Sequence, residues 1–149
     1  MAYYPTRATM WHQEAIIVTG NALSFSLNTS QTFNGWWVQS TPADGNKFTN
    51  GFFLKGGSGY TLYLFGVTGS DCGKIDWKID GTSVATGQDW YSSSLTLKVT
   101  KTITSLTISG DGFHVLEGTV NGKNASSSNY FIPLDYYWFS LSTDTEDHS

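Results

Sequence analysis

The strongest constraint on the fold is a run of strict alternation at residues 73–81, which read GKIDWKIDG. Apolar side chains occupy every second position, at Ile75, Trp77 and Ile79, and this period predicts a β-strand with one buried face. Asp80-Gly81 ends the run and supplies the positive-φ residues that a tight hairpin requires. The chain is therefore expected to return antiparallel to this strand through residues 83–85.

Similar patterns recur along most of the chain and predict an all-β fold. Alternating or β-prone segments cover residues 14–18, 23–27, 35–39, 48–54, 60–67, 95–99, 106–108, 113–120 and 130–141. No segment carries the apolar repeat of a helix. We expect an antiparallel β-sandwich of about ten strands, because turn residues separate the segments at the spacing typical of this class. Segment 60–67 is apolar on both faces and should be a central strand, with 55–59 as a hairpin loop before it.

The chain divides into one domain with two extensions. Residues 1–12 predict an extended N-terminal arm, because Pro5 opposes a helix and the apolar residues there follow no period. Such an arm needs a surface to pack on, either its own domain or a neighbouring subunit. Residues 13–141 form the sandwich, and 142–149 form an acidic, flexible tail. The residues expected to dock the arm are Tyr3, Tyr4, Pro5, Met10 and Trp11.

Charge and hydropathy exclude several partners. The formal net charge is −4, and the eight Lys and Arg residues are scattered along the chain. A nucleic-acid partner is not expected, because phosphate binding needs concentrated positive charge. No apolar run approaches the ~20 residues of a membrane span, so no membrane insertion is expected. The N-terminus also lacks the basic and apolar layout of a signal peptide.

Residues with catalytic or metal-binding potential do not form a recognisable motif. Cys72 is the single cysteine, which leaves no intrachain disulfide, and it is expected to be a small residue at a strand edge rather than a reactive thiol. Gly110-Asp111-Gly112 is half a calcium loop and is expected to be a plain turn, although calcium bound by loop carbonyls stays possible. We therefore expect no cofactor, no metal and no enzyme activity. An enzyme that cleaves glycans is retained as a third reading, because the sequence does not place the carboxylates relative to one another. The histidines considered are His12, His114 and His148, and the carboxylates are Asp76, Asp80, Asp89, Asp111, Glu117 and Asp135.

Two adjacent aromatic pairs are the main functional indication. Trp36-Trp37 and Trp90-Tyr91 would each direct one member out of the core if they lie in strands. An exposed Trp or Tyr on a β-surface suits stacking on a sugar ring or packing against another subunit. Burial of both members beneath a covering loop is an equal alternative. The Ser- and Asn-rich segment 121–129 offers either hydrogen bonds to a sugar or a solvated connection.

Several motifs together resemble a known kind of domain. They are TMWHQEA at residues 9–15, GKIDW with IDG at 73–81, GQDWY at 87–91, NGKNASSSNYF at 121–131 and YWF at 137–139. The series resembles a β-sandwich domain of virion surface proteins in tailed bacteriophages. The order of strands is also similar to that of jelly-roll carbohydrate-binding modules. Both resemblances imply a jelly roll, and the phage family implies a non-enzymatic structural protein, usually homotrimeric.

The resemblance leads to a main functional expectation and one alternative. The chain lacks the coiled-coil or β-helical repeat of a fibre shaft, so we expect a capsid or tail decoration protein or a tail-fibre head. Its expected partners are itself in a homotrimer, other virion proteins and a host-surface glycan, and its expected location is the virion surface after synthesis in the host cytoplasm. The alternative is a carbohydrate-binding module that recognises a polysaccharide. In either case the candidate exposed aromatics are Trp36, Trp37, Trp90 and Tyr91.

Overall fold

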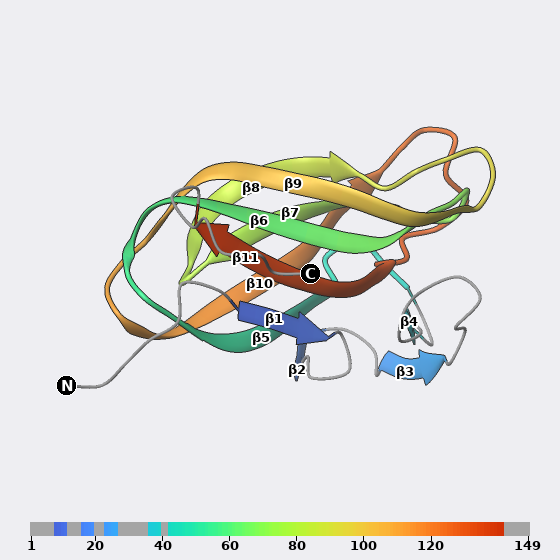
Figure 1. Cartoon of the computed structure of the whole chain (residues 1–149). Helices are drawn as coiled ribbons and strands as arrows, with labels where there is room; N and C mark the ends of the chain where they lie inside the picture. The colour runs from blue at the N-terminus through green and yellow to red at the C-terminus, as the bar shows by residue number, and fades with distance from the viewer. Residues whose placement is uncertain (1–7, 12–15, 20–22, 27–35, 40–41, 142–149) are drawn as a thin grey trace.

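The computed structural model describes residues 8–11, 16–19, 23–26, 36–39 and 42–141, with side chains from residue 42 onward. In this part of the chain all regular structure is β, as expected, and most of it forms two facing sheets (Figure 1). No helix in the described residues is long and apolar enough to cross a membrane.

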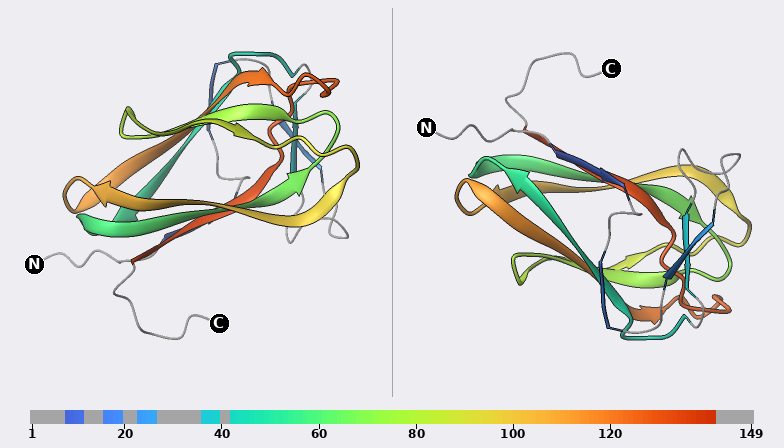
Figure 2. Two further views of the ribbon diagram at one scale, coloured as in Figure 1. Left: turned by 90° about the horizontal axis from the view of Figure 1, so that it is seen from above. Right: turned by 90° about the horizontal axis from the view of Figure 1, so that it is seen from below.

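The strands form two large antiparallel sheets and one small one. The four-stranded sheet has the order β1-β11-β6-β9, and the five-stranded sheet has the order β2-β5-β10-β7-β8. Figure 2 shows these two sheets as separate layers. The four-stranded sheet contains β1 (Ala8–Trp11), β6 (Gly57–Thr68), β9 (Thr96–Ile108) and β11 (Leu134–Leu141). The five-stranded sheet contains β2 (Ile16–Thr19), β5 (Lys47–Leu54), β7 (Gly73–Ile79), β8 (Thr82–Asp89) and β10 (Gly112–Lys123). The small sheet pairs β3 (Leu23–Ser26) with β4 (Trp36–Gln39).

The alternating run at residues 73–81 forms the predicted strand and hairpin. Strand β7 spans Gly73–Ile79 and pairs antiparallel with β8 through Ile79 and Thr82. Asp80 and Gly81 make the turn with φ of 50° and 81°, the left-handed conformation that this hairpin requires. The inward-facing residues Ile75, Trp77 and Ile79 are all buried.

The core lies between the two large sheets and is built from alternate residues of each strand. In β5, β7 and β10 every second residue is buried, and the intervening positions face outward. Strand β6 is an interior strand between β11 and β9, as its two apolar faces predicted. The largest fully buried side chains are Trp77, Trp90, Tyr60, Tyr137, Phe52 and Phe139.

The prediction of a hairpin loop at residues 55–59 is wrong. Strand β5 pairs with β2 and β10, whereas β6 pairs with β11 and β9 in the other sheet. The chain therefore crosses from one sheet to the other between Leu54 and Gly57. The crossing is held by the amide of Gly56, which donates to Asp111 Oδ1 at 2.8 Å. Local composition predicted a turn here, but strand partners are chosen by which apolar faces can be buried together.

Part of the expected N-terminal arm is a strand of the domain itself. Ala8–Trp11 form β1, which pairs along the edge of the four-stranded sheet with β11. The register places Met10 opposite Tyr137 and Trp11 opposite Tyr136. This part of the arm uses its own domain as the packing surface.

Candidate functional site

The outer face of the five-stranded sheet carries the most exposed aromatic pair in the described residues. Phe53 on β5 and Phe113 on β10 are directly opposite in the strand register. Their exposed fractions are 58% and 59%, although phenylalanine is usually buried. The ring centroids lie 5.5 Å apart at an interplanar angle of 62°. The two rings form one small aromatic surface, which we call the Phe53–Phe113 pair.

A glycine gives this pair its geometry. Gly51 lies on the same face of β5, two residues before Phe53 and opposite Val115. A Cβ added to Gly51 would lie 2.5 Å from Cζ of Phe113, closer than any real contact, while Cδ2 would be 3.7 Å away. These distances place an edge of the Phe113 ring in the space above Gly51. One edge of the ring therefore packs against the sheet at Gly51, and the ring also contacts Phe53.

Polar groups continue along the same face beyond the aromatic pair. Lys47 Nζ lies 3.3 Å from Glu117 Oε1 across β5 and β10. Asp76 of β7 accepts a hydrogen bond of 2.9 Å from the side chain of Asn121 and one of 2.7 Å from the amide of Gly87. The face thus presents an apolar aromatic end followed by hydrogen-bonding side chains. This combination can hold a ligand that has both C–H faces and hydroxyl groups.

The carboxylates considered in the sequence are engaged in contacts within the fold. Asp89 Oδ1 accepts from the amide of Tyr91, and its Oδ2 accepts from the side chain of Asn124 at 2.9 Å. Asp80 contacts His114, and Asp135 is 1% exposed. Across the described part of the chain, no three His, Cys, Asp or Glu side chains gather as a metal site would require. Asp76, Asp111 and Glu117 likewise contact other residues of the fold.

The structure separates the two members of the pair Trp90-Tyr91. Trp90 is 1% exposed, and its indole nitrogen donates to Gln88 Oε1 at 3.0 Å, so its ring offers no face to a ligand. The ammonium group of Lys101 lies 5.4 Å from the centroid of this ring. Tyr91 is half-buried in the connection between β8 and β9, and its proposed ligand contact stays a prediction.

The remaining predicted site residues are placed only in part. Trp36 and Trp37 lie in β4, opposite Ser26 and Phe25 of β3, and their side chains are outside the described part. Tyr3, Tyr4 and Pro5 lie outside the described residues altogether.

The Ser- and Asn-rich segment 121–129 bonds mainly to the protein itself. The hydroxyl of Ser127 donates to the carbonyl of Cys72 at 2.8 Å, and the amide of Ser128 donates to the carbonyl of Ser70 at 2.8 Å. Asn124 contacts Asp89 as described above. Ser127, Ser128 and Asn124 thus tie the connection after β10 to neighbouring parts of the chain.

A second aromatic cluster covers the outer face of the four-stranded sheet. Phe65 and Tyr136 stack at 4.4 Å with only 9° between their planes, and Tyr63 lies 5.0 Å from Trp138. Because neighbouring strands are about 4.8 Å apart, parallel rings at this spacing stand upright on the sheet and face one another. Burial of Tyr136, with a smaller effect of Asp135, raises the pKa of its phenol. This cluster stacks on itself and is less exposed than the Phe53–Phe113 pair.

Sequence reasoning missed Phe53 and Phe113 although a signal was present. Phe52-Phe53 is an adjacent aromatic pair like Trp36-Trp37, and Phe113-His114 is an adjacent pair of rings. In each case strand alternation sends one ring inward and the other outward. Their closeness was not visible, because β5 and β10 are about 60 residues apart in sequence and meet only in the sheet.

Comparisons with known proteins identify the fold. No protein-family model matches the sequence, and no curated protein matches it. Solved structures do match. A Paenibacillus xanthan lyase matches over 93% of this chain with a TM-score of 0.80 at 18% identity. The chain spans only 13% of that enzyme's length.

Two further matches are separate modules of similar length. The CBM36-1 domain of a multidomain xylanase from the hindgut metagenome of Trinervitermes trinervoides has a TM-score of 0.63 at 14% identity, covering 93% of this chain and 99% of that one. A carbohydrate-binding module CBM36 in complex with calcium and xylotriose has a TM-score of 0.56 at 14% identity, covering 89% and 99%. At these identities the likeness shows the fold, a jelly-roll β-sandwich of the kind found in carbohydrate-binding modules.

Proposed function

We propose that this chain is a non-catalytic carbohydrate-binding module that holds a polysaccharide on the outer face of its five-stranded sheet. Phe113 and Phe53 stack against sugar rings in this proposal. The polar side chains farther along β5 and β10, including Lys47 and Glu117, hydrogen-bond to hydroxyl groups of the same glycan.

The exposure of the Phe53–Phe113 pair is the observation that carries the proposal. Two phenylalanines more than half exposed on adjacent strands cost solvation free energy unless a ligand covers them. Each ring has few rotatable bonds and sits on a rigid strand, so little conformational entropy is lost on binding. A protein partner is less favoured, because stable interfaces bury about 800 Å² on each side and polar residues follow the pair directly.

The similar structures support the choice of a polysaccharide. The two modules described above are carbohydrate-binding modules by name, and one of them is in complex with xylotriose. The other similar structure reported above is a xanthan lyase. These likenesses support the second resemblance seen in the sequence, to carbohydrate-binding modules, rather than the first.

Calcium accompanies xylotriose in one of the similar structures, and its fit to this chain can be examined. Calcium prefers several carboxylate and carbonyl oxygens gathered around one point. In residues 42–141 no such group of carboxylates is found, and both oxygens of Asp89 already accept hydrogen bonds. The described residues therefore show no carboxylate cluster for calcium, and the proposed binding uses stacking and hydrogen bonds.

The proposal is tested by affinity electrophoresis and calorimetry on a panel of soluble polysaccharides that includes xylan and xanthan. We expect the chain to bind at least one of them and Phe113→Ala and Phe53→Ala to weaken that binding about tenfold or more, the usual effect of losing a stacked ring. Leu97→Ala is the matched control, because Leu97 is also an exposed apolar residue, at 41%, but lies on β9. Equal binding by all four proteins would place the glycan elsewhere, and no binding by any of them would reject the proposal.

The virion-surface reading stays a separate prediction. It requires a homotrimer, contacts with other virion proteins and a location on the particle, none of which the comparisons support. The mass of the purified chain in solution tests it. A monomer would remove the trimer on which this reading depends, whereas a stable trimer would favour it.

A further inference from the structure

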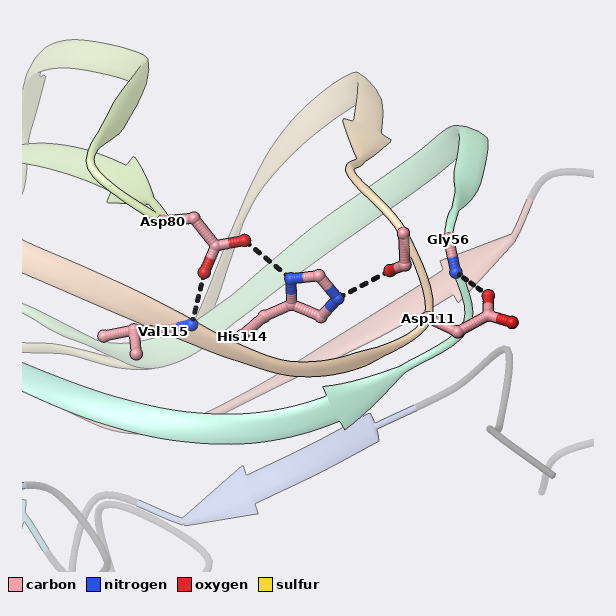
Figure 3. A network of polar contacts seen from close by, with 6 residues as sticks. Gly56, Asp80, Asp111, His114 and Val115 are labelled. Atoms are coloured by element: carbon pink, nitrogen blue, oxygen red, sulfur yellow. Dashed lines mark hydrogen bonds and ion pairs between the residues drawn. The ribbon is translucent and has the colours of Figure 1, made fainter. Parts of the chain in front are cut away.

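Next to Phe113 in the sequence, His114 joins Asp80 in a network of polar contacts that links three segments of the chain (Figure 3). His114 follows Phe113 in β10 and points to the opposite side of the sheet, where it is 4% exposed. Its Nδ1 lies 2.6 Å from Oδ2 of Asp80, and its Nε2 lies 2.9 Å from the carbonyl oxygen of Gly110. The imidazole thus connects β10 with the β7–β8 turn and the β9–β10 turn.

Asp80 also binds the backbone of β10. Its Oδ1 accepts from the amide of Val115 at 2.9 Å, and its own amide donates to the carbonyl of Val115 at 2.9 Å. These bonds continue the β7–β10 ladder past its last register pair, Leu116 and Ile79. Asp80 therefore fixes the backbone of β10 two residues after Phe113, and His114 fixes it one residue after Phe113.

The partners of His114 and Asp80 indicate which atoms donate and which accept in this network. A carbonyl oxygen only accepts, so Nε2 of His114 carries a hydrogen and donates to Gly110. At 2.6 Å a hydrogen must also lie between Nδ1 and the carboxylate oxygen of Asp80. Both oxygens of Asp80 are thus used, one toward Val115 and one toward His114.

The neighbouring turn is held in the same way. Asp111 accepts a hydrogen bond of 2.8 Å from the amide of Gly56, where the chain crosses between the sheets. The ring of Phe52 packs on His114 with centroids 5.7 Å apart, from the position directly opposite on β5. The start of β10 is therefore restrained from both sides, by Asp80 after β7 and by Phe52 on β5.

We propose that Asp80 and His114 are positioning residues for sugar binding, which hold the start of β10 so that Phe113 keeps its edge above Gly51 and its face toward the ligand. The inference rests on the proposed function. In this proposal neither residue touches the glycan. By holding Phe113 in place before the sugar arrives, they reduce the conformational entropy that this side chain loses on binding.

Three substitutions at Asp80 distinguish an effect on the position of Phe113 from an effect on the free energy of unfolding. Asp80→Gly keeps the positive φ of the turn, since glycine adopts φ of 50° freely, but removes both side-chain bonds. Asp80→Asn also tolerates this φ, and its amide can accept from Val115 through oxygen and donate to Nδ1 of His114 through nitrogen. Asp80→Ala removes the bonds and strains the turn, and serves as the severe case.

Binding of the polysaccharide found for the wild-type chain is measured for each variant together with the free energy of unfolding. We expect Asp80→Gly to bind about tenfold more weakly, and Asp80→Asn to bind like the wild type. Gln88→Leu, which weakens the core away from the aromatic pair, is the stability control and should bind normally. Unchanged binding by Asp80→Gly while Phe113→Ala fails to bind would overturn the positioning role and leave the proposed function intact.

A second readout tests the position of the Phe113 ring without a ligand. Nuclear Overhauser contacts between the Phe113 ring and the Hα atoms of Gly51 report the position of the ring directly. These contacts should persist in Asp80→Asn and weaken in Asp80→Gly. Equal contacts in the wild type and Asp80→Gly would overturn the inference without reference to any ligand.

Discussion

Phe113 of β10 and Gly51 of β5 are diagonal neighbours on the sheet, and the edge of the Phe113 ring fills the space that a side chain at Gly51 would need. Gly51→Ala is therefore expected to push the ring away from the sheet. Because Phe113 is 59% exposed, the ring can turn outward, and the free energy of unfolding should change by only about 0.5 kcal/mol.

Calorimetric titration and thermal unfolding of Gly51→Ala check this expectation together. The variant should lose affinity for the glycan toward the level of Phe113→Ala while unfolding like the wild type. Thr61→Ala, on the outer face of the other sheet, is the control and should bind normally. Full affinity in Gly51→Ala would show that glycan binding does not require the Phe113 ring to pack above Gly51.

Gln88 serves as the common acceptor for two buried tryptophans. The indole nitrogens of Trp77 and Trp90 donate to its Oε1 at 2.8 Å and 3.0 Å. Gln88→Leu leaves both donors without this acceptor, and the expected loss is about 1–3 kcal/mol of unfolding free energy for each. Gln88→Glu keeps an oxygen at the site and should lose less. Denaturant unfolding followed by tryptophan fluorescence measures both, and equal stability of the two variants would contradict the shared-acceptor argument.

Gly118 lies beneath two aromatic rings of the core. A Cβ at this position would lie 2.6 Å from Cε1 of Phe48 and 2.9 Å from Cζ3 of Trp77. These rings are buried and pack against each other at 5.8 Å, so they cannot move aside as Phe113 can. Gly118→Ala should lower the free energy of unfolding by about 1–3 kcal/mol through overpacking.

Denaturant titration of Gly118→Ala beside Thr119→Ala provides the comparison. Thr119 is the next residue and faces outward, so its substitution should change the free energy of unfolding much less. A similar change in both variants would show that the rings near Gly118 adapt to the added methyl group.

Cys72 is expected to be unreactive in the folded protein. The thiol is 3% exposed, and burial, with a further effect of Asp71, raises its pKa from 9.0 to about 12. Alkylation by iodoacetamide at pH 8 should therefore be slow and become fast when the chain unfolds, because the thiolate is the reactive form. Mass spectrometry after timed labelling measures the rate, and rapid labelling of the folded protein would contradict the burial of Cys72.

The same shift has a defined effect on stability. The folded state keeps the Cys72 proton over a pH range in which the unfolded state has lost it. The free energy of unfolding should thus fall as the pH rises from 9.0 toward about 12. Cys72→Ala should remove this contribution, which a comparison of the two unfolding curves at pH 8 and pH 10 would reveal.

Much of the fold could be predicted because its signals are local. Strand β7 and its hairpin follow from alternation at residues 73–79 and from Asp80-Gly81, and both are confirmed. The hairpin expected at 55–59 failed for the opposite reason. Gly-rich composition marks a change of direction, but it does not specify whether the chain pairs with its neighbour or crosses to the other sheet.

The candidate site shows the same limit more sharply. Adjacent rings at Trp90-Tyr91 and Phe52-Phe53 are equivalent in sequence, because alternation directs one member of each pair outward without saying what lies there. The structure buries Trp90 against Gln88 and leaves Phe53 exposed beside Phe113.

By itself, the sequence determined the fold class of the protein, which is all-β and antiparallel. Those properties depend on period, turn chemistry and composition, which are read within a few residues. Only the tertiary structure decided which aromatic rings meet and which are exposed. Phe113 reaches Gly51, and Asp80 reaches His114, through pairings between strands that are far apart in the chain. Such pairings are set by the burial of whole sheet faces, which no local pattern contains.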